Sequence, residues 1–332
     1  MMISCDWGTS AFRLRVVEPA GAAGIGSGAT GPGTGTGAEP AARIVASIQS
    51  NNGIASTYAD WKRSGLPEEH RMDFYRAILK IALDDLQREH SIDLRGATLI
   101  LSGMASSSFG MLELPYHPLP FSLSGEDLEP AMLPATADFP HAIILVPGVR
   151  SADDVMRGEE TQLIGCAPPP TERLFIFPGT HSKHIVVRGD QAVAFKTFMT
   201  GEVFGLLSKQ SVLAASVEES VFSFFAFWAG IDAAKHSGIL HSAFSVRTNE
   251  LLGQFPKAHN YHYLSGLLIG EELKDLPKQP VTLVAVAPML RSYELALKRL
   301  GFEDIEIIDA DEALVDGHCR LFARYAGADE NP

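Results

Sequence analysis

The sequence has 332 residues, more than a single hydrophobic core usually supports, so two domains are expected. Hydrophobic residues make up 46% and charged residues 20%, as in folded globular proteins. The formal net charge is -13, and no cluster of lysine and arginine stands out, which argues against a nucleic acid or a membrane as partner. An anionic substrate would have to be bound by a few local donors.

The first residues predict a β-hairpin. An apolar run from Met2 to Cys5 ends at Asp6, and beyond Gly8 apolar and polar residues alternate, which is the period of a strand with one buried face. No basic segment followed by a long apolar run opens the sequence, so we expect no signal peptide and a cytoplasmic protein. The three cysteines are far apart and lack metal-ligand spacing, which favours reduced thiols.

Residues from about 19 to 42 are dominated by glycine, alanine and threonine. Such a segment buries too little apolar area to offset the entropy lost on ordering, so a flexible insertion in a hairpin is expected. A phosphate-binding loop is the alternative interpretation. It is disfavoured because the segment lacks the Lys-Ser/Thr ending and the strand-to-helix context of a P-loop.

The rest of the chain alternates helices and strands, which predicts an α/β protein. Apolar residues three and four positions apart indicate helices, and short apolar runs indicate buried strands. In chain order the predicted elements are a helix at 69–90, strands at 98–101 and 142–146, a helix at 159–165, strands at 174–177 and 185–187, a helix at 203–214, a buried helix at 220–231, a strand at 281–286, a helix at 289–300, a strand at 305–308 and a helix at 312–325.

One pattern occurs twice, as CDWGTSAFRLRVV and as IFPGTHSKHIVV. Each segment contains an apolar strand, a Gly-Thr turn with small hydroxyl residues, and a second apolar strand. The two glycines, Gly8 and Gly179, are separated by about half the chain, which predicts two related lobes. We place these lobes at residues 1–157 and 158–332, with the last helix, 312–325, a candidate to pack back on the N-terminal lobe.

The two turns have a composition suited to phosphate. Glycine lets a phosphate oxygen approach the backbone amides, and the hydroxyl groups of Thr9, Ser10, Thr180 and Ser182 add donors. Asp6, at the end of a buried strand, is suited to hold Mg²⁺ through water, because magnesium keeps much of its hydration shell. The alternative is that Asp6 and Thr9 only stabilise a tight turn. The repetition favours the phosphate interpretation.

The stretch Arg157-Gly158-Glu159-Glu160 carries two acids where a helix is predicted to begin. Acids at this position usually need no explanation beyond the helix dipole. The same position also suits a carboxylate that accepts the proton of a substrate hydroxyl during phosphoryl transfer. Glu159 and Glu160 are therefore candidates for a catalytic base.

The sequence resembles the sugar kinases of the hexokinase–actin–Hsp70 superfamily, and most closely the 2-dehydro-3-deoxygalactonokinase family. The matching segments run in family order from Asp6 to Gly301 and read DWGTSAFRLRV, LSGMASSSFG, VMRGEETQLIG, FPGTHSK, MTGE, LSGLLIGEE and VTLVAVAPMLRSYELALKRLG. The resemblance implies two ribonuclease H-like lobes with a central cleft, as in the actin-like ATPase fold. It also implies ATP and Mg²⁺ in that cleft, and phosphorylation of 2-dehydro-3-deoxy-D-galactonate, a small sugar acid, at its 6-hydroxyl in galactonate catabolism.

The resemblance also assigns site residues. The first phosphate motif corresponds to Asp6, Gly8, Thr9 and Ser10, and the second to Gly179, Thr180, His181 and Lys183. The stretch GEETQ stands where glycerol-kinase-like relatives have a Gly-Asp that supplies the base, which makes Glu159 the base and Glu160 the second candidate.

The substrate loop would comprise Ser102, Gly103, Met104 and Ser107. Arg157 is a candidate for the carboxylate of the sugar acid, because a guanidinium fork suits that group.

One stretch departs from the family pattern. Where the adenosine motif usually reads Leu-Val-Ala-Gly, this chain continues with Val286, Ala287 and Pro288. Ala287 is the residue assigned to the nucleotide here, and the nucleotide preference is left open. Two other functions are also left open: a kinase of a different sugar or sugar acid, and a nucleotide-binding relative without turnover. Intact Asp6 and Glu159 favour an enzyme.

Two further features are given structural interpretations. His259 and His262 stand in a polar stretch after a proline and are expected on the surface. The aromatic residues between Phe222 and Trp228 are expected in a lobe core or in a subunit contact, so a homodimer is left open.

Overall fold

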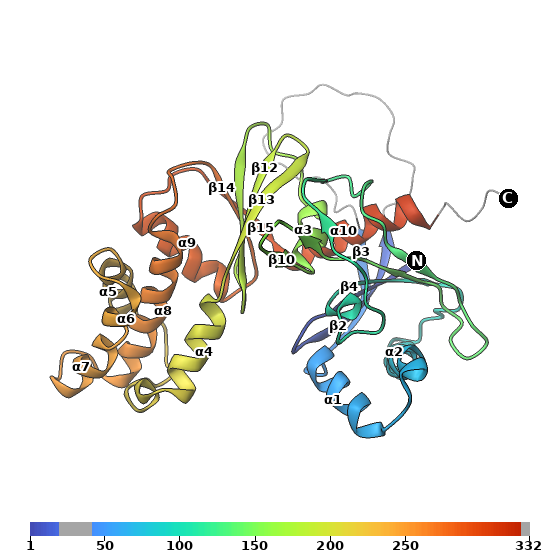
Figure 1. Ribbon diagram of the computed structural model, residues 1–332, viewed down its shortest axis with the longest axis horizontal. Helices are drawn as coiled ribbons and strands as arrows, with labels where there is room; N and C mark the ends of the chain where they lie inside the picture. Colours follow the sequence, from blue (N-terminus) through green and yellow to red (C-terminus); the bar gives the residue numbers. More distant parts are fainter. Residues whose placement is uncertain (20–41, 327–332) are drawn as a thin grey trace. The chain divides into compact units, whose positions relative to one another are not determined.

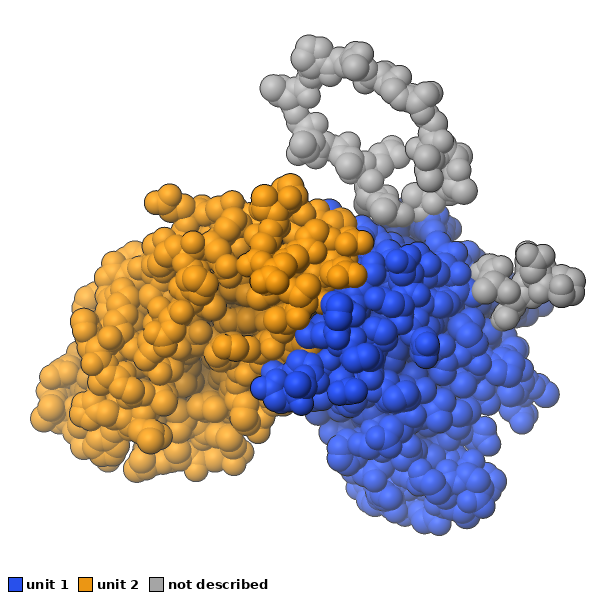
Figure 2. All heavy atoms as spheres, turned by 45° about the horizontal axis from the view of Figure 1, so that its top comes forward, with its two compact units in different colours: residues 1–167, 312–332 blue, residues 168–311 orange. Residues whose placement is uncertain are grey.

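The structure, a computed structural model, describes residues 1–19 and 42–326. The chain divides into two compact units, residues 1–167 with 312–332 and residues 168–311, which are coloured separately in Figure 2. The flexible insertion expected at about 19–42 lies outside the described residues except for its two ends. Within the described residues, no helix has both the length and the apolar character needed to cross a membrane.

A mixed sheet forms the centre of the first unit. Its strands are β1 (Met2–Trp7), β2 (Phe12–Pro19), β3 (Ala42–Ser50), β4 (Thr98–Gly103), β7 (Ala131–Leu133) and β8 (Ile143–Leu145). They run in the order β3-β2-β1-β4-β8-β7. The hairpin strands β1, β2 and β3 are antiparallel, whereas β4 is parallel to both β1 and β8. In this register Asp6 lies opposite Arg13 on one side and Ser102 on the other.

Helices of the first unit cover this sheet. They are α1 (Ile54–Ser64), α2 (Arg71–His90), α3 (Glu159–Gly165) and α10 (Ala310–Tyr325), with 3-10 turns η1 (Glu68–His70) and η2 (Met104–Ser106). The short strands are β5 (His117–Pro118), β6 (Phe121–Ser122), β9 (Val149–Arg150) and β10 (Val155–Met156). Helix α2 buries Tyr75, Leu79, Leu83 and Leu86 at four- and three-residue spacing, and these side chains join those of the sheet in one core.

The second unit has a sheet of the same kind. Its strands are β11 (Arg173–Phe177), β12 (Ser182–Arg188), β13 (Gln191–Phe198), β14 (Val281–Ala285) and β15 (Ile305–Asp309). They run in the order β15-β14-β11-β12-β13. The pairs β11–β12 and β12–β13 are antiparallel, whereas β11–β14 and β14–β15 are parallel.

The two sheets repeat one topology. In both sheets the first four strands lie in the order third, second, first, fourth, and the next strand is β8 in the first unit and β15 in the second, with the same strand directions. In each unit the Gly-Thr turn joins the first strand to the second. The internal repeat that the sequence predicts is therefore present in the topology.

Helices cover the sheet of the second unit. They are α4 (Thr200–Gln210), α5 (Phe224–Ala234), α6 (Ile239–Ser242), α7 (Ser245–Leu251), α8 (Lys257–Leu273) and α9 (Met289–Arg299), with the 3-10 turn η3 (Val212–Ser216). Helix α5 packs along α8, and both lie beside α9 (Figure 1). Leu264 and Leu267 of α8 belong to a core shared with α5, and β14 packs in a neighbouring core with α9.

One prediction about these helices is wrong. The helix expected at 220–231 begins at Phe224 and buries only one face, since Phe227 is fully buried while Phe225 is 69% exposed. The helical stretch expected near 203–214 is present, as α4 up to Gln210 followed by η3. The 220–231 run appeared uniformly apolar, so its composition concealed which face is exposed. Helices α1 and α8 and strand β13 were not predicted.

Candidate active site

The first Gly-Thr turn is held by the start of helix α1. The amides of Ile54 and Ala55 donate to the carbonyl oxygens of Gly8 and Thr9 at 2.9 and 3.0 Å, and the turn is closed by Gly8 N–H to Ala11 O at 2.9 Å. Gly53 fits so tightly that a Cβ there would lie 2.4 Å from the oxygen of Thr9. The helix therefore fixes the backbone of the turn, while the side chains of Thr9 and Ser10 are exposed.

Asp6 ends strand β1 next to this turn. Its Oδ2 accepts a hydrogen bond from Arg13 Nη1 at 2.9 Å, and its side chain is 22% exposed. Arg13 faces Asp6 across the hairpin, as the register requires. A partly exposed carboxylate at a strand end is the kind of oxygen donor that magnesium binds directly or through water, so this residue fits the ion. In the described residues there is no cluster of three or more His, Cys, Asp or Glu side chains able to hold a metal.

Two glycines bring the substrate loop and the start of helix α3 together beside Asp6. Gly103 has φ +80°, and a Cβ there would lie 3.3 Å from Asp6 Oδ1 and 3.0 Å from the oxygen of Trp7. Gly158 has φ +114°, and its Cβ would lie 3.6 Å from the Cα of Gly103. Both conformations favour glycine because a side chain would be strained. Asp6, Gly103 and Gly158 are thus gathered at one edge of the sheet.

The two acids at the start of α3 have different surroundings. Glu160 is fully buried, and both its carboxylate oxygens accept from the amide of Gly158, at 2.8 and 2.7 Å. Burial, and then the nearby charge of Glu159, raise the pKa of Glu160 to about 7. Glu159 is only half-buried and accepts from the amide of Arg157 at 3.2 Å. Glu159 is therefore partly open to solvent, whereas Glu160 is enclosed.

The predicted substrate-loop residues differ in accessibility. Ser102 is fully buried, and its hydroxyl lies 3.0 Å from Nε2 of His318, so its side chain is committed inside the unit. Ser107 is 5% exposed and donates to the oxygen of Met104 at 2.8 Å, which shapes the loop. Met104 is half-buried.

Arg157 joins this loop through its guanidinium. Its Nη1 donates to Ser106 Oγ, and the group lies 4.3 Å from the ring centroid of Tyr116. Its Nε is buried and has no hydrogen-bond partner among the described residues. A half-buried guanidinium stacked on an aromatic ring is held in place and keeps its charge, as recognition of a carboxylate requires.

The second Gly-Thr turn lies against the start of helix α4. The amide of Glu202 donates to the oxygen of Thr180 at 3.0 Å. A Cβ on Gly201 would lie 2.5 Å from the oxygen of Gly179 and 2.8 Å from the Cα of Thr180. Lys183 Nζ donates to the oxygen of His181 at 2.9 Å. The turn is thus fixed from behind, while Thr180 is exposed.

A cavity of about 570 Å³ adjoins this turn within the second unit. Its wall includes Gly179 and Thr180, together with residues from α4, from the segment before α5, from α8 and from the start of α9. Aromatic side chains contribute on one side, among them Phe222 and Tyr261. A partly apolar cavity of this size with a glycine turn at one end suits a nucleoside with its phosphates on the turn.

Only some of the residues that line this cavity were named from the sequence. Gly179 and Thr180 line the cavity, and Ala287 does not, although Pro288 and Met289 beside it do. His262 was expected on the surface, and that prediction is wrong: it is 6% exposed and lines the cavity from α8. Burial lowers the pKa of His262, and its Nε2 lies 3.2 Å from the oxygen of Ser220. The helical periodicity of residues 257–273 was the signal that could have revealed this face.

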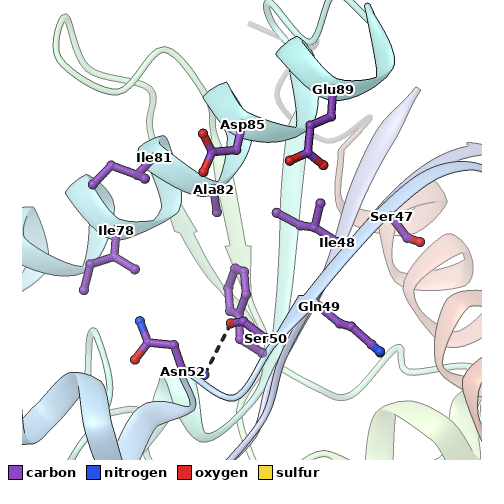
Figure 3. A pocket seen from close by; sticks show the side chains of 11 residues that line it. Ser47, Ile48, Gln49, Ser50, Asn52, Ile78, Ile81, Ala82, Asp85 and Glu89 are labelled. Carbon is purple, nitrogen blue, oxygen red and sulfur yellow. Dashed lines mark hydrogen bonds between the residues drawn. The ribbon is translucent and has the colours of Figure 1, made fainter.

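Another cavity, about 590 Å³, lies between strand β3 and helix α2 in the first unit (Figure 3). Asp85 and Glu89 stand on one side of it and Ser47 and Gln49 on the other. None of the predicted site residues lines it. The two carboxylates in its wall would repel an anionic ligand, so this cavity is not a candidate phosphate site.

Comparison with known proteins shows to which family the chain belongs. The sequence model of the 2-keto-3-deoxy-galactonokinase family matches residues 6–321. The chain belongs to this family. It is 33% identical over 231 residues to the 2-dehydro-3-deoxygalactonokinase of Escherichia coli K12, covering 66% of this chain and 76% of the relative. A Rhizobium meliloti strain 1021 protein, given the same name provisionally, is 32% identical over 235 residues, with the same coverage.

The fold agrees with the family. A crystal structure from Sinorhizobium meliloti, provisionally described as a 2-dehydro-3-deoxygalactonokinase, superposes with a TM-score of 0.74 at 27% identity, covering 98% of this chain and 97% of that one. The α/β class and the ribonuclease H-like, actin-like ATPase fold predicted from the sequence are confirmed. As a member of this kinase family the chain is a sugar-acid kinase, and its family and fold imply the use of ATP.

Proposed function

We propose that this kinase transfers the terminal phosphoryl group of ATP to the 6-hydroxyl of 2-dehydro-3-deoxy-D-galactonate. The substrate name comes from relatives about a third identical in sequence. The observation that carries the proposal is the approach of Gly103 to Asp6 and of Gly158, the residue before Glu159, to Gly103, because phosphoryl transfer needs a metal ligand and a base beside the acceptor.

Geometry favours Glu159 over Glu160 as the base. A pKa of about 7 would suit Glu160 for this task, but a base must first come within hydrogen-bond distance of the proton that it accepts. Glu160 is fully buried and caps the turn at Gly158, so it stabilises the start of α3. Glu159 is half-buried and accepts the hydroxyl proton as the acceptor oxygen attacks phosphorus.

Other residues bind and orient. Arg157, stacked on Tyr116, binds the carboxylate of the sugar acid, and Gly103 lets the substrate loop approach. Asp6 holds the Mg²⁺ that accompanies ATP, and this ion supplies positive charge to the phosphate oxygens when bound. The cavity beside Gly179 and Thr180 receives adenosine, and the two Gly-Thr turns, Thr9-Ser10 and Thr180-His181 with Lys183, each bind phosphate. Lobe closure over the bound substrates is expected, as in other kinases.

Substrate identity is tested by measuring ADP release with a panel of sugar acids. The highest kcat/KM is expected for 2-dehydro-3-deoxy-D-galactonate, and mass spectrometry should place the phosphate on its terminal carbon. Turnover with only a different sugar acid would show that this other acid is the substrate. Nucleotide binding without turnover on any acceptor would contradict the proposal as a whole.

The role of Glu159 is tested by Glu159→Gln. Loss of a general base costs about 10²–10⁴ in rate, so kcat should fall by that factor while the Kd for ATP-Mg²⁺ changes about twofold or less. Glu160→Gln is the matched control, because the neighbouring carboxylate is enclosed; its kcat should fall by less than about tenfold. The reverse order of effects would make Glu160 the base.

A further inference from the structure

A buried carboxylate lies behind the second Gly-Thr turn. Glu272 stands on α8, and its side chain is 1% exposed. Its Oε1 lies 2.8 Å from Nε2 of His184 on β12. Its Oε2 accepts from the hydroxyl of Tyr293 on α9 at 2.7 Å and from the hydroxyl of Thr200 at the start of α4. The carboxylate on α8 is thus hydrogen-bonded to β12, α9 and α4.

Burying a carboxylate is strongly unfavourable unless its oxygens are hydrogen-bonded, so this arrangement holds only if the three donors stay in place. Tyr293 is fully buried, and burial, followed by the charge of Glu272, raises its pKa well above the usual value. Its hydroxyl therefore keeps the proton that it donates to Glu272. His184 is 4% exposed, and its Nε2 must donate, because a carboxylate only accepts.

From Glu272 a directed chain of hydrogen bonds reaches the turn. Because the single hydroxyl proton of Tyr293 goes to Glu272, the hydroxyl of Ser182 must donate to the oxygen of Tyr293, at 2.9 Å. Ser182 in turn accepts from the amide of Gly179 at 3.4 Å, a longer contact. The orientation of the glycine in the turn is thus linked to a carboxylate on another helix.

A second route leads from Glu272 to the same turn. Thr200 is followed by Gly201, which lies so close to Gly179 that it has no room for a side chain. Leu268 of α8 and Ser292 of α9 line the cavity, whereas Glu272 and Tyr293 do not. Glu272 therefore contacts the elements that form the cavity wall without meeting its contents.

We propose that Glu272 is a positioning residue that fixes the 178–181 turn relative to the nucleoside cavity and so sets affinity for the phosphates of the nucleotide. This inference rests on the proposed function, because it takes the cavity and turn to bind a nucleotide. It predicts that replacing Glu272 weakens the binding of the phosphates but changes the binding of the nucleoside little. A residue that only stabilised the unit would affect both equally.

The test compares ADP and adenosine binding by calorimetry in wild type and in Glu272→Gln. The amide keeps the shape of the carboxylate but places a donor against another donor, so the network must rearrange. Loss of one charge-assisted hydrogen bond is worth about 1.5–3 kcal/mol, so the Kd for ADP should rise about tenfold or more. The Kd for adenosine should change less than about twofold, because its contacts are untouched.

Tyr293→Phe provides a second variant that keeps the packing and removes the link from Glu272 to Ser182. It should weaken ADP binding in the same direction, and the double variant should be less than additive, because both changes break one chain. Glu271→Gln is the matched control: this neighbour on α8 pairs with Lys274 at 2.9 Å outside the network, and ADP binding should be unchanged.

Two results would overturn the inference. One is equal weakening of ADP and adenosine by Glu272→Gln or, if that variant does not fold, by Tyr293→Phe. The other is unchanged ADP binding in both variants while the wild type binds ADP normally, a result that leaves the proposed function intact. A wild type that binds no nucleotide would overturn the proposed function, and this inference with it.

Discussion

The two Gly-Thr turns share their local pattern but differ in the polar groups that support them. Each has a helix-start glycine packed against it, Gly53 for the first turn and Gly201 for the second. Behind the first, His318 of α10 bridges Ser4 and Ser102 at 2.7 and 3.0 Å. Behind the second, the carboxylate of Glu272 accepts hydrogen bonds from three side chains.

The difference concerns the residues directly beneath each turn. His318 ties together strands β1 and β4 two residues before Asp6, so it supports the sheet below the site. The Glu272 network runs into the turn itself, through Ser182 and Gly179. The same local motif can therefore be held either through its strands or through its own backbone. This difference predicts that side-chain changes disturb the second turn more directly than the first.

The largest effect is expected from adding a methyl group to the two helix-start glycines. In Gly201→Ala the new Cβ would overlap the oxygen of Gly179, and in Gly53→Ala that of Thr9, so either turn must move. Misplacement of a binding group by about 1 Å can cost on the order of 10² in rate, and kcat/KM should fall by about that factor in both variants.

The two substitutions should affect different quantities, the Kd for ADP in one variant and kcat in the other. Gly201→Ala should raise the Kd for ADP, because the second turn lines the cavity, whereas Gly53→Ala should mainly lower kcat. Steady-state kinetics and calorimetry distinguish these outcomes. Gly205→Ala, on the same helix as Gly201 but with open space around its Cβ, is the control and should retain activity. Identical effects on ADP binding would argue against separate roles for the turns.

An effect of intermediate size is expected on the free energy of unfolding at acid pH, and it comes from His318. Burial lowers the pKa of His318 from 6.5 to about 3, so below pH 6.5 the unfolded chain binds a proton that the folded chain does not. The free energy of unfolding must therefore fall as pH decreases from 6.5 towards 3. At pH 5 this single group lowers it by about 2 kcal/mol.

The measurement is urea unfolding at pH 7.5 and pH 5 for wild type and His318→Gln. Glutamine can still donate and accept, but it does not titrate, so the variant should lose about 2 kcal/mol less than the wild type between the two pH values. Its overall stability should be lower because the fit to Ser4 and Ser102 is poorer. An equal loss in both proteins would show that His318 does not bind the proton on unfolding.

The smallest effect is expected from the exposed hydroxyl groups of the turns. Thr9→Ala and Thr180→Ala each remove one proposed phosphate donor, worth about 1 kcal/mol for an ordinary hydrogen bond, or about fivefold in binding. Thr180→Ala should raise the KM for ATP, and the serine variants of both positions should restore wild-type values. If neither alanine variant changes kcat or KM, the hydroxyl groups do not contact phosphate.

Much of the fold could be predicted from the sequence because its signals are local. The helix expected to open at Glu159 begins at that residue, and the strands at 98–101, 174–177 and 281–286 were displaced by at most two residues at their ends. Period-two and period-three-to-four patterns report directly on which face of an element is buried. The repeated hairpin was visible because both copies kept the same short motif.

The site could be predicted only in part. Asp6, Gly103 and Glu159 belong to motifs and were named, and the structure brings Gly103 close to Asp6 and Gly158, the residue before Glu159, close to Gly103. That the turns at Gly8 and Gly179 bind one polyphosphate stays a prediction. The sequence left Glu159 and Glu160 as alternatives because adjacent acids differ only in the side of the helix that they face. Burial of Glu160, a property of the packed unit, separates them.

By itself the sequence determined two repeated α/β lobes, two glycine turns and an acid-rich helix start, because each depends on neighbouring residues alone. Tertiary structure decided which buried polar groups meet: Glu272 with residues from three other elements, and His318 with Ser4 and Ser102 over three hundred and two hundred positions away. Periodicity indicates that a side chain is buried, but not its partner. That depends on long-range packing, where the need to satisfy every buried donor and acceptor selects the pairing.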